Sequence, residues 1–161
     1  MCSPYSGQAL RPMRNRIHAL HMEVSYLVKA RRETVYAAYT DFETWPKWSR
    51  EETNAKVIGR EGDVVTIQSE IISRGKRRMA VAKLATSPPE QVESEGETRF
   101  TKWKRLVRFE DAPEGTKVTA SLDVFVKRRW AWIFAPRLNE EARTSVLERL
   151  KSFSEYVEGL P

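Results

Sequence analysis

The stretch TDFETWPKW, residues 40–48, gathers two tryptophans, a phenylalanine and a proline into nine residues of a chain that is otherwise rich in charge. Asp41 is a favourable residue for starting a helical turn. Pro46 suits the first helical position, and it favours an extended conformation at Trp45 before it. We therefore predict two short helical segments with a sharp bend at Trp45. The aromatic side chains either fill a core or form the rim of an apolar cavity.

The segments on both sides of this stretch show strand and helix periodicity. Residues 23–30 alternate Val24, Tyr26 and Val28 on one side, as a strand does, and residues 31–40 have the spacing of a short helix. Six further strand-like segments follow, separated by turn sequences and by Pro88-Pro89. They are residues 53–59, 64–73, 77–86, 90–96, 99–112 and 116–126.

The last segment, residues 136–158, changes to the period of an amphipathic helix. Its apolar stripe consists of Leu138, Ala142, Val146, Leu150, Phe153 and Val157. The order of elements is therefore one strand, two short helices, six strands and one long helix. We predict an α+β fold in which a seven-stranded antiparallel sheet curls around the long C-terminal helix.

The composition fits a single domain. The chain has 161 residues and a mass of 18.7 kDa, which is enough to bury a core without disulfides or a metal. No window approaches the roughly 18 consecutive apolar residues that a membrane span requires. The single cysteine, Cys2, gives no intramolecular disulfide, and we expect a cytoplasmic location.

Residues 1–22 lack clear periodicity and contain proline, glycine, serine and arginine, so we interpret them as a flexible extension before a domain at residues 23–161. They lack the apolar stretch of a signal peptide. An overlong start before Met22, a remnant of an expression vector or a mitochondrial transit peptide are alternative explanations of this segment. His18 and His21 both fall within it, so we predict that no histidine base serves the folded domain.

The net charge of +6 raises the question of nucleic-acid binding. Arginines in residues 1–22 supply half of this charge, and residues 23–161 hold 25 basic against 22 acidic side chains. The basic runs at 74–78, 102–105 and 127–129 fit a solvated surface, because acidic residues are interleaved along most of the chain. We therefore expect no nucleic-acid partner.

The segments VSYLVKARRETVYAAYTDFETWPKWS (24–49) and VLERLKSFSEYVE (146–158), with the Pro88-Pro89 break, resemble the START, Bet v 1 and polyketide-cyclase (SRPBCC) superfamily. The resemblance covers about residues 23–158 and implies the helix-grip fold. It also implies a cavity between the concave sheet and the long helix, which in relatives holds sterols, lipids, polyketides, hormones or quinone-like molecules. In that arrangement Phe42, Trp45 and Trp48 lie near the end of the cavity.

Strand alternation predicts which side chains face inward. Combined with the resemblance, it gives these candidate ligand contacts: Phe42, Trp45, Ile67, Ser69, Trp103, Arg105, Leu122, Val124, Val146 and Leu150. Arg105 stands out, because it falls on the same side as Trp103 and Val107. A buried guanidinium requires a partner, so Arg105 meets an acid, lies at the wet mouth of the cavity or binds an anionic ligand group. A break in the strand register is a further alternative.

Other sequence features give weaker indications of function. Trp130 and Trp132 lie beside Arg128 and Arg129, a combination that fits peripheral membrane contact, docking on the sheet rim or a dimer interface. The chain lacks the phosphate-binding patterns GxGxxG and GxxxxGK. His18 and His21 are not joined by a cluster of carboxylates or thiols. We therefore expect no metal, no cofactor and no catalytic residues.

The leading hypothesis is a binding or transport protein that holds a hydrophobic small molecule, such as a lipid, polyketide, quinone-like or aromatic compound. An aromatase or cyclase that acts on polyketides is the alternative, in which Arg105 works with Tyr26 or Tyr39. A third hypothesis is an interaction module related to quinone chaperones or chaperone regulators. The sequence leaves the oligomeric state open.

Overall fold

The computed structural model describes residues 16–73, 75–97 and 101–161, with the backbone alone for residues 73 and 130–139. Its strands are β1 (Arg16–Val28), β2 (Glu52–Glu61), β3 (Val64–Ser73), β4 (Lys76–Ser87), β5 (Gln91–Glu97), β6 (Thr101–Ala112) and β7 (Gly115–Lys127). Its helices are α1 (Arg32–Thr40), η1 (Phe42–Thr44), α2 (Trp45–Trp48), η2 (Arg128–Trp130) and α3 (Ala131–Glu158).

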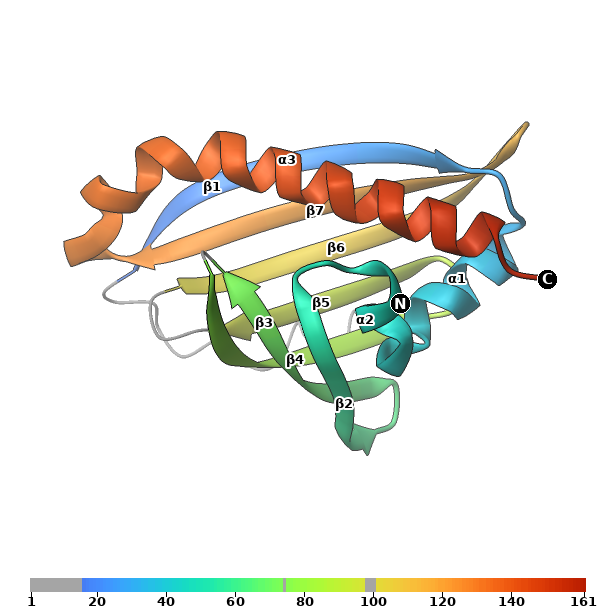
Figure 1. Ribbon diagram of the computed structural model, residues 1–161, viewed down its shortest axis with the longest axis horizontal. Coiled ribbons are helices and arrows are strands. Elements are labelled where there is room, and N and C mark those ends of the chain that lie inside the picture. The colour runs from blue at the N-terminus through green and yellow to red at the C-terminus, as the bar shows by residue number, and fades with distance from the viewer. Residues whose placement is uncertain (1–15, 74, 98–100) are drawn as a thin grey trace.

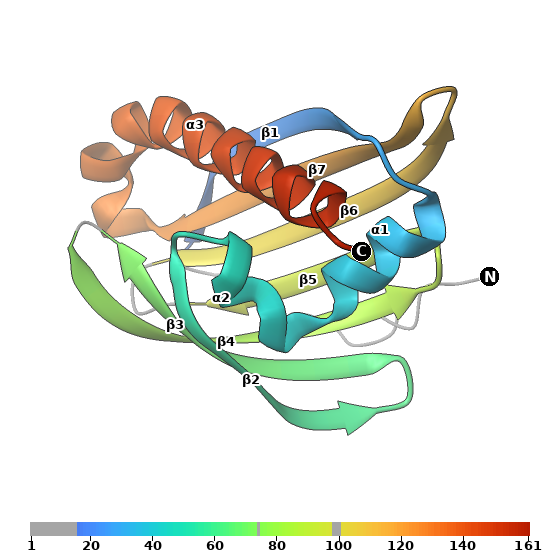
Figure 2. The same ribbon diagram turned by 45° about the vertical axis from the view of Figure 1, so that its right-hand side comes forward.

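The strands form one antiparallel sheet with the order β1-β7-β6-β5-β4-β3-β2. Figure 1 shows α3 running along β1 across the sheet, and Figure 2 shows the sheet curving beneath α3 with α1 and α2 at one end. The α+β helix-grip arrangement expected from the sequence is confirmed. α3 begins five residues before the expected position, and the six later strands lie within two residues of their expected bounds.

The aromatic stretch forms helical turns, but its bend differs from the prediction. Trp45 has φ −51° and ψ −41°, so it is helical rather than extended, and Pro46 occupies the second position of α2. A proline is tolerated there because the N–H that it lacks has no partner in a first helical turn. The Trp45 ring is buried and its Nε1 donates to the Tyr39 carbonyl at 2.8 Å. Asp41 makes no side-chain cap; its carbonyl accepts from the Thr44 backbone instead.

β1 begins at Arg16, seven residues earlier than the sequence indicated. The prediction of a flexible extension is therefore wrong for residues 16–22, which pair with β7, while residues 1–15 lie outside the described part of the chain. A register shift between His18 and Leu20 interrupts the alternation of side chains. This irregularity removed the period-two signal from the sequence and hid the first half of the strand.

The two histidines consequently belong to the folded domain, which corrects the prediction that no histidine is available to it. His18 Nε2 and His21 Nδ1 each lie 2.8 Å from Oδ1 of Asp123 on β7. The three side chains are on the outer, convex face, because Asp123 alternates with the buried Leu122 and Val124. They join β1 to β7 and lie away from the inner face.

The core fills the end of the concave face next to α1 and α2. Tyr39 contacts the rings of Trp45, Trp48, Phe109 and Phe153, with centroid distances of 5.5–6.1 Å. The α3 stripe faces this core at Val146, Leu150, Phe153 and Val157, which are all buried, with Ala142 partly buried. Leu138 lies among the residues whose side chains are not described.

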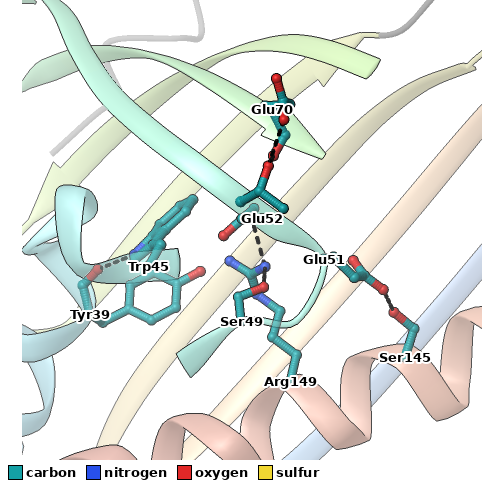
Figure 3. Close-up of polar contacts among 9 residues, drawn as sticks. Tyr39, Trp45, Ser49, Glu51, Glu52, Glu70, Ser145 and Arg149 are labelled. Atoms are coloured by element: carbon teal, nitrogen blue, oxygen red, sulfur yellow. Dashed lines mark hydrogen bonds and ion pairs between the residues drawn. The ribbon is translucent and has the colours of Figure 1, made fainter. Parts of the chain in front are cut away.

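A buried arginine on the apolar face of α3 ties this helix to β2 and α2 (Figure 3). Arg149 Nη1 donates to Glu52 Oε1 at 2.9 Å and to Ser49 Oγ at 3.0 Å. Its guanidinium carbon lies 5.0 Å and 4.9 Å from the Trp45 and Trp48 ring centroids. Burial acts to lower the pKa of Arg149, but the charge of Glu52 raises it above its ordinary value. A second link on the same helix joins the Ser145 hydroxyl to Glu51.

The Arg149–Glu52 pair should contribute strongly to the stability of the fold, because it joins α3 to the sheet. Glu52→Met leaves the guanidinium buried without its carboxylate, so we expect the free energy of unfolding to fall by about 3–5 kcal/mol in urea titrations. The double variant Glu52→Met/Arg149→Met should recover most of this loss, because no isolated charge remains. Asp111→Asn removes an exposed partner of Arg32 and should cost less than about 1 kcal/mol. If Glu52→Met lowered the free energy of unfolding by as little as Asp111→Asn does, the Arg149–Glu52 pair would not be a buried ion pair.

The histidine cluster should make part of the stability depend on acid pH. Burial acts to raise the pKa of Asp123, but the hydrogen bonds from His21 and His18 outweigh it and lower the pKa. A lowered folded-state pKa contributes stability above the unfolded value of about 3.9, and this contribution is lost as the pH falls through the folded value. The wild type should therefore be more stable than Asp123→Asn at pH 5, and this advantage should shrink at pH 3. An advantage that stays constant over this range would contradict the role of Asp123.

Candidate functional site

The inner face of the sheet carries two adjacent rows of side chains, each crossing six strands from β3 to β1. Cross-strand pairing joins directly opposite residues, so each row lies on one face. The first row is Ile67, Ala82, Gly96, Trp103, Val124 and Leu20. The second row is Val65, Leu84, Ser94, Arg105, Leu122 and Met22. These rows bring together residues that are up to 104 positions apart in the chain.

Side-chain size changes along the inner face of the central strands. Toward α1 and α2 the face carries Val92, Val107 and Phe109, which are almost completely buried. In the opposite direction β4 and β5 carry Ala80, Ala82, Ser94 and Gly96 at inward positions. Small side chains fill less of the space between sheet and helix than large ones do. Within the two rows, the small inward side chains are therefore confined to β4 and β5, beside the buried Leu84.

Trp103 lies directly on the backbone of β5. A Cβ atom added to Gly96, its cross-strand partner, would be 2.4 Å from Trp103 Cζ2, which is far inside van der Waals contact. Only glycine leaves room for the indole ring in this position. Trp103 is itself partly exposed, although it packs against the core cluster. It thus presents an aromatic surface on the inner face.

Arg105 is on the inner face, as the alternation of β6 predicted. It lies opposite Ser94 and Leu122, both buried, and two residues from the buried Val107. Its guanidinium carbon is 5.3 Å from the Trp103 ring centroid, a cation–π contact. Within the described residues, no carboxylate lies within ion-pair distance of Arg105. The alternative of a break in strand register does not occur at this position.

The candidate contacts fall into separate groups. Ile67, Ser69, Trp103, Arg105, Leu122 and Val124 lie together on the inner face of the sheet. Val146 and Leu150 face them from α3 as buried members of the core. Phe42 and Trp45 instead pack edge to face in the aromatic cluster, with ring centroids 5.4 Å apart. The side chains of Trp130 and Trp132 lie outside the described part.

Three residues that shape the inner face or hold α3 on it, Arg149, Glu52 and Gly96, were not predicted from the sequence. Arg149 is three residues after Val146 and four before Phe153, so helical spacing places it on the apolar stripe, and that spacing was the available signal. Its partner Glu52 is distant in sequence and had no comparable signal. Gly96 could be recognised only from the register that sets it opposite Trp103.

Other parts of the described structure offer less for an apolar ligand. A surface pocket of about 500 Å³ lies between the start of α1 and the β6–β7 turn, away from the two rows. Its lining is mostly charged, from residues 29–33, 111–112 and 114–115. Among the described residues, no group of three or more histidine, cysteine or acidic side chains is placed to hold a metal ion. None of the described helices is long and apolar enough to cross a membrane.

Comparison with solved structures supports the same fold. A protein from Thermus thermophilus has a TM-score of 0.77 and 18% identity, covering 86% of this chain and 97% of that one. The Zhui aromatase/cyclase from a Streptomyces species has a TM-score of 0.75 and 11% identity, covering 86% and 93%. A START superfamily protein from Mycobacterium smegmatis has a TM-score of 0.73 and 21% identity, covering 88% and 99%. At these identities the likeness concerns the fold.

Comparison by sequence identifies the family. No curated protein matches the chain. The family described as polyketide cyclase/dehydrase and lipid transport matches residues 19–155, which span most of the sheet and nearly all of α3. The match includes the rows on the inner face and the Arg149–Glu52 pair. The chain therefore belongs to the polyketide cyclase/dehydrase and lipid transport family, within the START, Bet v 1 and polyketide-cyclase superfamily.

Proposed function

We propose that this protein binds and carries a hydrophobic small molecule between the inner face of its sheet and α3. The observation that carries this proposal is the change in side-chain size along that face. Large buried residues fill the end near α1 and α2, whereas Ala80, Ala82, Ser94 and Gly96 occupy inward positions of β4 and β5 beside a partly exposed Trp103, with the buried Leu84 between them. Apolar walls with few polar groups are typical of sites for such ligands.

The family supports a ligand of this class without naming it. Its description joins polyketide cyclases and dehydrases with lipid transport, and one similar structure is an aromatase/cyclase. In the described structure the two histidines and the buried carboxylate are directed elsewhere. His18 and His21 are on the convex face, and the buried Glu52 is held by Arg149. A carrier role is therefore the better-supported interpretation of the site.

A cyclase-type reaction is the second candidate. The inward guanidinium of Arg105 favours it, because a fixed cation stabilises negative charge that develops on an enolate or phenolate oxygen. The two functions differ in what happens to the bound molecule. Native mass spectrometry of protein purified from its own host should show a co-purifying compound, and a carrier should release it with its mass unchanged. Turnover of a poly-β-ketone chain would favour the cyclase instead.

Filling the inner face should block uptake of an apolar probe. Ala82→Phe places a ring between Ile67 and Gly96, so we expect it to weaken binding of N-phenyl-1-naphthylamine about tenfold or more, measured by probe fluorescence. If the ring enters the space that we propose for the ligand, the thermal midpoint of this variant should stay near that of the wild type. Val81→Phe adds the same ring on the outer face, where Val81 is 45% exposed, and should leave binding unchanged.

Two results would contradict this proposal. If the interior is already filled, the wild type takes up no probe, and Ala82→Phe is destabilised by overpacking, which typically costs about 1–3 kcal/mol. If the probe binds on the convex face instead, Val81→Phe rather than Ala82→Phe changes the fluorescence titration. The same pair of variants detects both results.

A further inference from the structure

We propose that the ligand carries an anionic group on an aromatic or conjugated ring system, and that Arg105 and Trp103 hold these two features together. This inference rests on the proposed function, because it specifies the chemistry of the molecule bound on the inner face. The relevant class comprises hydrophobic acids in which a carboxylate, a sulfonate or an ionised phenol adjoins a flat ring. Neutral lipids lie outside this class.

The balance of charge on the inner face leaves Arg105 without an acidic partner among the described residues. Glu52 is the only buried carboxylate in the part of the chain that the structure describes, and Arg149 already binds it. Arg78, which is opposite the inward Ile71, has an interaction of its own. Arg105 contacts the Trp103 ring, and no described carboxylate pairs with it. A cation that is partly withdrawn from water gains most from an anionic partner.

The surroundings of the Arg105 guanidinium also favour an anionic ligand. Its cross-strand neighbours are a buried serine and a buried leucine, Ser94 and Leu122, so no acidic group adjoins it within its row. A guanidinium is planar and presents parallel N–H groups that match the two oxygens of a carboxylate. In such a partly enclosed position each charge-assisted hydrogen bond is stronger than on an open surface.

An aromatic side chain, Trp103, lies beside this cation. Trp103 is fixed against the backbone at Gly96, and its ring and the guanidinium are 5.3 Å apart. A ligand that pairs with Arg105 therefore places its adjoining atoms next to an indole ring. Flat ring systems gain from contact with indole through offset stacking or edge-to-face packing. The pair thus selects a ring and a negative charge at a fixed separation.

Two naphthalene probes separate the contribution of charge from that of apolar burial. 8-Anilinonaphthalene-1-sulfonate and N-phenyl-1-naphthylamine share one skeleton, and only the first carries a sulfonate. We expect Arg105→Gln to weaken binding of the sulfonate probe about tenfold or more, as expected for loss of a hydrogen bond to a charged group. Binding of the neutral probe should change less than about twofold. Fluorescence titrations and competition by 2-naphthoate against 2-naphthamide measure both effects.

Matched variants exclude an effect of net charge or folding. Arg108→Gln removes the same charge from the outer face of the same strand and should leave both affinities unchanged. Gly96→Ala should displace the Trp103 ring and weaken both probes, since the added Cβ overlaps the indole. Circular dichroism and thermal midpoints check that each variant is folded.

The outcomes distinguish this inference from the proposed function. If both probes bind the wild type but Arg105→Gln weakens them equally or not at all, the anionic ligand class is wrong while hydrophobic binding stands. The same holds if Arg108→Gln weakens the sulfonate probe as much as Arg105→Gln does. If neither probe binds the wild type, both proposals fail.

Discussion

The buried pair of Arg149 and Glu52 is the interaction on which the arrangement of this protein depends. It joins the long helix to the first strand after the aromatic turns, and Trp45 and Trp48 lie against the same guanidinium. Helix, edge strand and short helix are thereby held at one point. A charge withdrawn from water tolerates few alternative packings, because each alternative leaves it without a partner. The pair therefore fixes where α3 lies on the sheet.

The position of α3 set by this ion pair also determines where large side chains pack on the inner face. The aromatic cluster around Tyr39 and Phe153 forms beside Arg149, so the large side chains collect at the end near α1 and α2. The central strands then carry alanine, serine and glycine at inward positions in the other direction, beside Trp103 and Arg105. The aromatic cluster and these smaller side chains therefore lie toward different ends of one concave surface. A ligand bound on the inner face, as we propose, would leave the contacts that hold the helix in place.

Much of the fold could be predicted from the sequence, because long periodic segments carry their own signal. β3 and much of β6 alternate apolar and polar residues, and the stripe from Val146 to Val157 shows the helical period, so these strands and the final helix could be placed. The early start of β1 could not be predicted, since a bulge after His18 removes the alternation. Pro46 gave a misleading signal at Trp45, because buried aromatic packing outweighs the local preference for an extended residue.

The candidate site was only partly predictable for a related reason. Alternation alone placed Arg105 and Trp103 on one face, since both belong to one strand. Their significance depends on distant residues: Gly96 opposite the indole, Ser94 opposite the guanidinium, and Glu52 already bound elsewhere. Among the arginines on the described inner face, Arg149 has the buried carboxylate of Glu52 as its partner, whereas no described carboxylate pairs with Arg105. Arg149 uses that carboxylate to hold the fold, which leaves Arg105 as the cation that can recognise a bound molecule.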